Sequence, residues 1–527
     1  MILITSAAYI DGEFAAEFGE LPPVCLPLGN KRLLDHQIEW LRQTQEDIYL
    51  SLPVGFELDE LYVKYLTLID ISIINVPLGL SLGESVIYCC NSLGVHLENI
   101  RILHGDTLVM DADANKMDYI AVSKNRGFYQ RGAVYLNTLA EKAKTTTKNV
   151  GDDEVVLAGY FSFSSAKELI KEITRSRGDF VAGVSSYCDN HNIEFEKCDN
   201  WLDFGHINTY FRSRALMTTQ RSFNNMIITT AKVTKSSKKK EKMYGEINWF
   251  QSLPGDMRLY APHMLGSFEN NDEVGYSLEY LYLLPLCDLF VFCAHPYQTW
   301  RIIFKACRNF LEDCRDYTVG NFADTKQFDD LYYPKTMTRL DEFSRKTKFD
   351  IERPITFNGT ELPSLVEIAE ITSRDITALH KNNITIIHGD FCLSNILYDF
   401  RKLGIKVIDP RGIDAANEST LYGDNRYDIA KLFHSVFGLY DFIIAGQYTL
   451  EIEKPYTVKF NIENKNNLAE IQKEFIRVFF HDNLYNIKEI NAITIHLFLS
   501  MLPFHDEDPE RQMALMANAI KMYLESC

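Results

Sequence analysis

The stretch Ile387-His388-Gly389-Asp390, with Asn395 five residues further on, decides the fold of the second half of this chain. An apolar run follows it and ends in Ile408-Asp409-Pro410-Arg411-Gly412. Phosphoryl transfer needs a carboxylate to accept a hydroxyl proton, and oxygen ligands to hold magnesium against the phosphates. Asp390 suits the first role, and Asn395 and Asp409 suit the second. We expect residues 397–407 to form a hairpin between them.

The spacing H-x-D-x-x-x-x-N, followed by a strand that ends in Asp, resembles the aminoglycoside phosphotransferase and choline kinase family. The resemblance covers roughly Phe223 to Cys527. It implies an α+β fold of the protein-kinase type, Mg²⁺, ATP as phosphoryl donor, and a small alcohol or sugar as acceptor. The sequence pattern predicts mostly helices from Ser364 onward, apart from strands around Ile386 and Val407.

A kinase of this type also needs a lysine on a strand for the nucleotide phosphates, and a helix glutamate that orients this lysine. Lys235 follows the β-branched run Ile227–Val233, and Glu246 lies in the helical pattern that comes next. Lys232 and Lys242 are alternatives for the lysine, because this stretch is rich in lysine.

The segment Glu279-Tyr280-Leu281 is interpreted as the linker to the second lobe of the kinase. Backbone groups of Glu279 and Leu281 are therefore candidates for binding adenine. Further on, Asp428 comes just before a helix predicted over 429–437. It either fastens the catalytic loop, as a similar aspartate does in the resembling family, or is a first-turn charge that the helix dipole favours.

The first part of the chain alternates strand-like and helix-like patterns. This rhythm predicts an α/β domain with a parallel or mixed sheet covered by helices. The predicted strands are 1–6, 47–52, 71–76 and 100–103, and the predicted helices are 30–43 and 82–93.

Two carboxylates stand out in this first part. Asp106 follows a predicted strand in His104-Gly105-Asp106-Thr107, and Asp203 lies in Trp201-Leu202-Asp203-Phe204-Gly205-His206. A nucleotidyl transfer needs a divalent cation between an NTP and the incoming phosphate, and carboxylates from two strand ends can hold one. Asp106 and Asp203 are therefore candidate Mg²⁺ ligands.

A strand that ends in G-D and a later W-x-D-x-G resemble the nucleotidyltransferases that make nucleotide-activated sugars and phosphocholine. The resemblance covers roughly residues 1–215. It implies a Rossmann-type mixed sheet that binds an NTP, whether CTP, UTP or GTP. It assigns nucleotide contacts to a G-L turn that enters a helix, to the glycine of the G-D pair, and to a basic pair. These residues are Gly79, Leu80, Glu84, Gly105, Lys31 and Arg32.

The phosphate loop departs from that family's pattern. The family carries G-x-G-x-R and then a proline-lysine pair, whereas this chain has Ser6-Ala7-Ala8-Tyr9-Ile10-Asp11-Gly12-Glu13 and Pro23-Val24. No arginine or lysine precedes Lys31. Either Lys31 and Arg32 hold the triphosphate instead, or the domain has lost this reaction.

Asp111 and Asp113 form a D-x-D, which glycosyltransferases of a related fold use to hold a metal and a sugar nucleotide. A polar turn after the strand is the favoured interpretation here. His104 and His206 flank the two candidate carboxylates, and we expect them to be hydrogen-bonded structural groups rather than metal ligands.

Length and charge limit these interpretations. A chain of 527 residues exceeds one hydrophobic core, so we expect domains at 1–215 and 216–527, the second with an N-lobe to about 285 and a C-lobe from about 286. The net charge of −18 argues against nucleic acid and anionic membranes as partners. The 11 cysteines include no C-x-x-C pair and suit reduced thiols. No signal peptide or membrane span is recognisable, which favours a cytoplasmic protein, and a homo-oligomer is left open.

The leading hypothesis is a bifunctional enzyme. The C-terminal domain phosphorylates a hydroxyl, and the N-terminal domain then transfers a nucleotide onto that phosphate to give an NDP-activated group. The resemblance implies capsule or lipopolysaccharide synthesis as the setting. A second hypothesis keeps the kinase active and makes the N-terminal domain a binding module. A third makes the N-terminal domain a glycosyltransferase.

Overall fold

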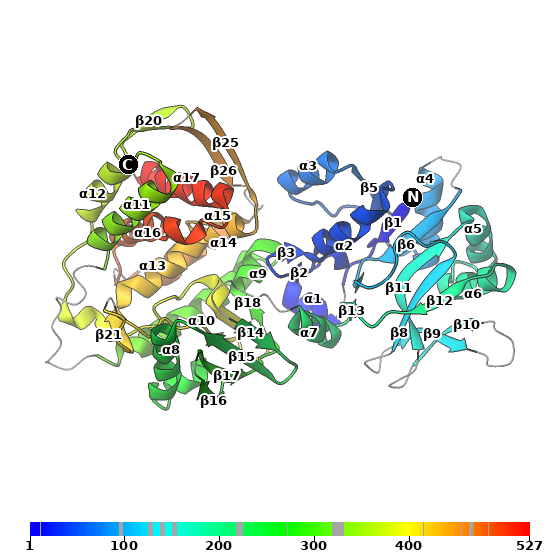
Figure 1. Cartoon of the computed structure of the whole chain (residues 1–527), viewed down its shortest axis with the longest axis horizontal. Coiled ribbons are helices and arrows are strands. Elements are labelled where there is room, and N and C mark those ends of the chain that lie inside the picture. The colour runs from blue at the N-terminus through cyan, green and yellow to red at the C-terminus, as the bar shows by residue number, and fades with distance from the viewer. Residues whose placement is uncertain are drawn as a thin grey trace. The chain divides into compact units, whose positions relative to one another are not determined.

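The computed structural model describes residues 1–10, 12–93, 98–124, 130–136, 143–149, 155–217, 225–270, 272–318, 331–414, 416–454, 456–462, 467–482 and 484–526 (Figure 1). The chain divides into two compact units, residues 1–217 with 292–294, and residues 218–291 with 295–527. Residues 218–224, where the second unit starts, lie outside the described ranges. Among the described residues, no helix is long and apolar enough to cross a membrane.

A mixed sheet forms the centre of the first unit (Figure 1). Strand β1 (Ile2–Thr5) pairs in parallel with β4 (Ile48–Pro53) and β6 (Ile100–His104), and β4 pairs in parallel with β5 (Ile71–Val76). Strand β11 (Val155–Phe163) joins β6 in antiparallel orientation, so the sheet is mixed, as expected. The other strands of this sheet are β8 (Tyr119–Lys124), β9 (Gln130–Leu136), β10 (Ala143–Asn149) and β12 (Glu194–Lys197).

Helices cover this sheet because it offers apolar side chains on both faces. Three of them, α4 (Leu82–Ser92), α5 (Ala166–Arg175) and α6 (Phe180–Asn190), share one buried apolar cluster with β1, β6 and β11. The predicted helices 30–43 and 82–93 are confirmed as α2 (Leu33–Leu41) and α4. The smaller elements of the unit are α1 (Gly12–Phe18), α3 (Glu60–Leu68), α7 (Ile207–Leu216), β2 (Pro27–Leu28), β3 (Lys31–Arg32), β7 (Thr107–Val109) and β13 (Trp201–Asp203).

The second unit begins with an antiparallel sheet of order β14-β15-β17-β16. Its strands are β14 (Asn225–Ile228), β15 (Lys232–Ser237), β16 (Met264–Glu269) and β17 (Val274–Glu279), and helix α8 (Lys240–Ser252) lies between β15 and β16 in sequence. Helix α8 packs against β15, β16 and β17, which places one helix on a small antiparallel sheet.

The rest of the second unit is mostly helical. Helix α16 (Ile487–Met501) is buried along most of its length, and helices α11 (Tyr333–Thr347), α12 (Leu365–Ser373), α13 (Asn425–Val436) and α17 (Pro509–Ser526) pack around it. Helix α10 (Tyr297–Arg315) packs against α15 (Leu468–Phe479). The expected hairpin at 397–407 is present as β22 (Ile396–Asp399) and β23 (Gly404–Val407). The remaining elements here are α9 (Leu286–Phe292), α14 (Tyr440–Ile444), β18 (Leu284–Pro285), β21 (Ile384–Ile386) and β24 (Tyr422–Asp424).

The expectation that strands after Ser364 lie only around Ile386 and Val407 is wrong. Strands β25 (Tyr448–Lys454) and β26 (Thr457–Ile462) form a hairpin, and β26 extends a sheet with β19 (Ile355–Phe357) and β20 (Thr360–Leu362). Every second residue of β26 is buried, which is the period of a half-buried strand. This alternation was the sequence signal for the hairpin.

Candidate active sites

Lys235 lies at the centre of the first candidate site, in the C-terminal unit. It is buried on β15, and its ammonium contacts the Glu246 carboxylate of α8 at 2.8 Å and the Asp409 carboxylate at 3.1 Å. The Tyr276 hydroxyl donates to the same Glu246 oxygen at 2.6 Å. Burial lowers the pKa of Lys235, but Asp409 and Glu246 outweigh burial and raise that pKa above its ordinary value. Lys235 is therefore a fixed cation that Glu246 orients.

The two alternative lysines lie elsewhere. Lys232 is exposed at the start of β15. The Lys242 ammonium is 3.7 Å from the second Glu246 oxygen and is about half exposed. Neither is in the position of Lys235, between the glutamate of α8 and the carboxylate of Asp409.

Asp390 and Asn395 contact each other on the loop between β21 and β22. The Asn395 amide nitrogen donates to the Asp390 backbone carbonyl at 2.9 Å and to the Asp390 carboxylate at 3.0 Å. The Asn395 backbone carbonyl accepts the N–H of Ile408 at 3.0 Å, so this loop is joined to the residue before Asp409. Because both side-chain bonds use the amide nitrogen, Asp390 leaves the amide oxygen unused. That oxygen and the Asp409 carboxylate are ligands of the type that Mg²⁺ prefers.

The other oxygen of Asp390 contacts a lysine that the sequence motif does not contain. The ammonium of Lys431, on α13, is 2.8 Å from Asp390 Oδ1. Burial raises the pKa of Asp390, but Lys431 outweighs burial and holds that pKa well below its ordinary value. Asp390 is therefore an ionised carboxylate. Sequence reasoning missed Lys431, whose one signal was its place three residues after Asp428, on the same helix face.

Asp428 fastens this loop. Its carboxylate accepts the backbone N–H groups of His388 at 2.6 Å and Gly389 at 2.8 Å, which decides between the two roles considered from the sequence. The His388 ring donates from Nε2 to the Ile408 carbonyl at 2.9 Å. Burial lowers the pKa of His388 to about 4, so this histidine is neutral and structural.

Glu279 and Leu281, the residues predicted to bind adenine, differ in their hydrogen bonds. Leu281 makes no backbone hydrogen bond within the described part of the chain, so its N–H and carbonyl are available to a ligand. Glu279 is bonded to His263 twice. Its N–H donates to the His263 carbonyl at 2.9 Å, and its carboxylate accepts the His263 N–H at 2.8 Å.

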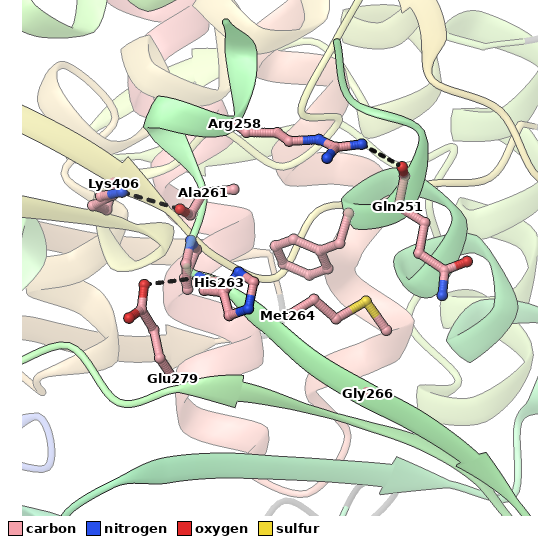
Figure 2. A pocket seen from close by; sticks show the side chains of 10 residues that line it. Gln251, Arg258, Ala261, His263, Met264, Gly266, Glu279 and Lys406 are labelled. Atoms are coloured by element: carbon pink, nitrogen blue, oxygen red, sulfur yellow. Dashed lines mark hydrogen bonds between the residues drawn. The ribbon is translucent and has the colours of Figure 1, made fainter. Parts of the chain in front are cut away.

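The Glu279 side chain lines a cavity of about 470 Å³, which Figure 2 shows together with Arg258, His263 and Lys406. The Lys406 ammonium donates to the Ala261 carbonyl at 3.0 Å. The cavity lining does not include Lys235, and it does not include Asp390, Asn395 or Asp409. The Glu279 carboxylate is therefore directed into this cavity and not towards Lys235 or Asp390.

Asp106 and Asp203 converge around Gly205 in the N-terminal unit. A Cβ built on Gly205 would lie 2.7 Å from an Asp106 carboxylate oxygen and 3.3 Å from an Asp203 carboxylate oxygen. Strands β7 and β13 pair with Asp203 opposite Thr107, and this pairing brings together two aspartates that are distant in sequence. The Gly205 N–H donates to Asp203 at 3.0 Å. Because Gly205 has no side chain, both carboxylates can approach its backbone this closely.

The G-D turn before Asp106 is held in place from two sides. A Cβ on Gly105 would stand 2.7 Å from the Thr5 carbonyl, so only glycine allows this turn to approach the end of β1. The Gln37 amide of α2 donates to the carbonyls of His104 at 3.0 Å and Thr107 at 2.7 Å. Burial lowers the pKa of His104 to about 4. His104 is thus a neutral buried ring.

Lys31 and Arg32, the basic pair predicted to bind the triphosphate, differ in exposure. Arg32 is buried, forms an ion pair with Asp59, and places its guanidinium carbon 4.0 Å from the centre of the Tyr62 ring. Nucleotide binding by Arg32 stays a prediction, and the ion pair with Asp59 already uses its charge inside the protein. Lys31 is exposed, and the Glu39 carboxylate is 3.9 Å from its ammonium. Lys31 stays a candidate.

The G-L turn lies between β5 and α4. Gly79 has φ of +85°, which favours glycine, and Leu80 is exposed. Glu84 forms a capping box with Ser81, whose N–H donates to the Glu84 carboxylate at 2.8 Å while its hydroxyl accepts the Glu84 N–H. Glu84 therefore caps the start of the helix, and nucleotide contacts by Gly79 and Leu80 stay a prediction.

The D-x-D is a polar turn, as favoured from the sequence. Asp111 accepts the N–H groups of Asp199 at 2.8 Å and Asn200 at 3.0 Å, and Asp113 accepts the N–H of Asn115 at 2.9 Å. Both carboxylates therefore hold loops of the chain.

Neither candidate site is a preformed metal cage of His, Cys, Asp or Glu side chains among the described residues. Within the described part of the chain, no three His, Cys, Asp or Glu side chains gather into a metal cage. Each site instead offers two oxygen-bearing side chains. This number suits Mg²⁺, which keeps waters and substrate phosphate oxygens in its coordination shell.

No protein-family model and no curated protein matches this chain. Among solved structures, a nucleoside-diphosphate-sugar pyrophosphorylase from Vibrio cholerae matches 41% of this chain and 99% of its own length at 15% identity, with a TM-score of 0.35. HddC from Yersinia pseudotuberculosis, solved with GMP-PN, matches 41% of this chain and 98% of its own length at 12% identity, with a TM-score of 0.31.

A thermostable mutant of aminoglycoside phosphotransferase APH(4)-Ia, solved with AMP-PNP and hygromycin B, matches 59% of this chain and 92% of its own length. The identity is 12% and the TM-score is 0.35. Both kinds of protein expected from the motifs thus occur among similar structures.

Proposed function

We propose that the C-terminal unit transfers the γ-phosphoryl group of ATP to a hydroxyl of a small alcohol or sugar. The observation that carries this proposal is the convergence of Lys235, Glu246 and Asp409, with Asp390 and Asn395 joined to the same segment. A fixed cation, an ionised carboxylate and a pair of oxygen ligands are the parts that phosphoryl transfer needs.

Each residue then has a defined role. The acceptor oxygen attacks the γ-phosphorus, the bond from that phosphorus to the ADP oxygen breaks, and the hydroxyl proton passes to Asp390. Asn395 and Asp409 would hold Mg²⁺, which would supply positive charge to neutralise the phosphates. Lys235 contacts the nucleotide phosphates, and the backbone of Leu281 contacts adenine.

We further propose that the N-terminal unit transfers a nucleotide to the phosphorylated product and releases pyrophosphate. The placement of Asp106 and Asp203 around Gly205 supports this, because two carboxylates that repel each other are stabilised by a cation between them. Asp106 and Asp203 would hold Mg²⁺ here, and the cation would supply positive charge against the phosphates. The resulting NDP-activated group would serve capsule or lipopolysaccharide synthesis in the cytoplasm.

A second candidate keeps the kinase and makes the N-terminal unit a nucleotide-binding or scaffolding module. The burial of Arg32 favours this alternative, because only Lys31 of the basic pair is then exposed to bind a triphosphate. The glycosyltransferase alternative has no such support, since Asp111 and Asp113 are bonded to backbone N–H groups.

The kinase proposal is tested by ATP turnover with a panel of small alcohols and sugars. Asp390→Asn should lower turnover by roughly 10²–10⁴-fold, the range for a positioned base, while Mg-ATP binding changes little. The matched control is Asp375→Asn, at a partly exposed carboxylate that pairs with Lys488. Turnover of Asp390→Asn near that of the unaltered enzyme would refute the assignment.

A further inference from the structure

Three cations gather around one buried tyrosine beside Asp390. Tyr427 and Lys431 lie one turn apart on α13, and Lys431 contacts the Asp390 carboxylate. The ammonium of Lys335, on α11, and the guanidinium carbon of Arg411 each lie 5.8 Å from the centre of the Tyr427 ring. We call Lys335, Arg411 and Lys431 the cation cluster.

Arg411 reaches this place along the catalytic loop. A Cβ built on Gly389 would stand 2.7 Å from Arg411 Cβ and 3.4 Å from Arg411 Cδ, so the arginine stem lies against the residue before Asp390. The N–H of Arg411 also donates to the His388 carbonyl at 2.9 Å. The cation cluster is therefore attached to the same loop that carries the proposed base.

The cation cluster lacks matching negative charge. Asp390 pairs with Lys431, but among the described residues no carboxylate forms an ion pair or hydrogen bond with Lys335 or Arg411. The neighbouring Arg339 is already paired with Glu342 at 2.7 Å.

The crowding of positive charge affects the pKa of Lys335. Tyr427 raises the pKa of Lys335, but burial and the like charges of Arg411, Lys431 and Arg339 outweigh it and lower that pKa below its ordinary value. Like charges held together cost free energy unless an anion joins them. The chain has 72 acidic and 54 basic side chains, so three clustered cations that share one carboxylate are not a product of its overall composition.

We propose that the cation cluster binds a carboxylate or phosphate on the acceptor, so that the kinase acts on a hydroxyl of an anionic compound. This inference rests on the kinase function proposed above and names its acceptor class. Hydroxy acids and phosphorylated polyols are then substrates, in preference to neutral polyols and amino alcohols. Lys335 and Arg411 hold the anion, and the acceptor hydroxyl faces Asp390.

The test uses four compounds on one three-carbon skeleton: glycerate, glycerol 3-phosphate, glycerol and 3-aminopropane-1,2-diol. Each is titrated calorimetrically into the full-length protein saturated with Mg-ADP. We expect one of the two anions to bind at least tenfold more tightly than glycerol, and the amine to bind most weakly. Preference for glycerate identifies a carboxylate, and preference for glycerol 3-phosphate identifies a phosphate. Binding of both anions no tighter than that of glycerol would overturn the inference.

Two variants localise the effect. Lys335→Met should weaken binding of the preferred anion by roughly tenfold or more, the range for loss of one charge-assisted contact, and should leave glycerol binding unchanged. Arg411→Met should act in the same direction. Lys381→Met, at an exposed lysine, is the matched control. A melting temperature equal to that of the unaltered protein excludes unfolding of each variant.

The outcomes separate this inference from the proposed function. If Lys335→Met weakens Mg-ATP binding instead of anion binding, the cation cluster serves the nucleotide and the acceptor class is wrong. If anion binding depends on Lys335 but no acceptor supports ATP turnover, the anion site stands and the kinase proposal fails.

Discussion

Gly412 packs so closely against Gly245 that neither position has room for a Cβ. Gly245 precedes Glu246 on α8, and Gly412 follows the segment that carries Asp409. The contact therefore joins the segment that carries Asp409 to the helix whose glutamate contacts Lys235. Gly412 also has φ of +65°, a conformation that L side chains rarely adopt.

Gly412→Ala should disturb the contact between α8 and the segment that carries Asp409. The added Cβ and the unfavourable φ cost about 1–3 kcal/mol, and displacement of α8 pulls Glu246 from Lys235. We expect kcat/KM for ATP to fall at least tenfold, measured by ADP release. Gly404→Ala is the control, because the nearest atom to its Cβ would be 3.9 Å away. Unchanged turnover in Gly412→Ala would show that the orientation of α8 does not depend on this contact.

Lys431→Met should move the acidic limb of the kinase pH profile. Lys431 holds the pKa of Asp390 below its ordinary value, and a carboxylate base works only when ionised, so activity is lost as pH falls through that pKa. Without Lys431 burial still raises the pKa, so the acidic limb of kcat should shift to higher pH.

The same ion pair affects stability with a defined sign. Because the folded pKa of Asp390 is depressed, its contribution is present above the unfolded pKa and is lost as pH falls towards the folded one. The wild type should therefore lose its stability advantage over Lys431→Met in acid. Lys473→Met, at an exposed lysine, is the control for both measurements. An acidic limb that stays in place would mean that Lys431 does not set the protonation of Asp390.

Asp409→Ala should abolish ATP turnover and weaken Mg²⁺-dependent nucleotide binding in the C-terminal unit. The variant loses a metal ligand and also removes one of the two carboxylates that contact Lys235. Nucleotide binding by the N-terminal unit should persist, because its carboxylates belong to a separate compact unit. Calorimetry with Mg-ATP and turnover assays check this, with the exposed Glu361→Ala as control. Loss of both activities in a folded variant would contradict the assignment of separate sites.

The parts of the site that sequence predicted are those that lie close together in the chain. Asp390 and Asn395 belong to one short loop, and the hairpin that leads to Asp409 follows directly, so local spacing was enough to place them. Lys235 and Glu246 were predicted from element order, since a strand and the next helix pack together in a small lobe.

The parts that sequence missed depend on partners from distant segments. Lys431 approaches Asp390 from α13, and no spacing rule connects a loop to a lysine of a later helix. Arg32 looked like a phosphate ligand because it stands beside Lys31, but Asp59, 27 residues away, pairs with it inside the protein. Whether a basic residue faces solvent or the interior is decided by tertiary packing, which a motif does not contain.

The N-terminal site gives the last prediction. In full-length protein carrying Asp409→Ala, which silences the C-terminal site, one of Mg-CTP, Mg-UTP or Mg-GTP should still bind. Gly205→Ala should weaken this binding at least tenfold, because its Cβ would stand 2.7 Å from the Asp106 carboxylate and displace that carboxylate. Asp203→Asn should also weaken nucleotide binding, and only when Mg²⁺ is present.

The measurement is calorimetry at millimolar nucleotide, followed by pyrophosphate release when the kinase's own product is added. Glu98→Gln, at an exposed side chain of the same unit, is the control. Two nearby carboxylates repel each other, so removal of Mg²⁺ should also lower the melting temperature of a nucleotide-loaded protein. Because Arg32 is buried and paired with Asp59, we expect only Lys31 and the metal to contact the triphosphate, which lowers the expected affinity. If no nucleotide binds the Asp409→Ala protein, the N-terminal unit is not a transferase, and the chain is a kinase joined to a non-catalytic domain.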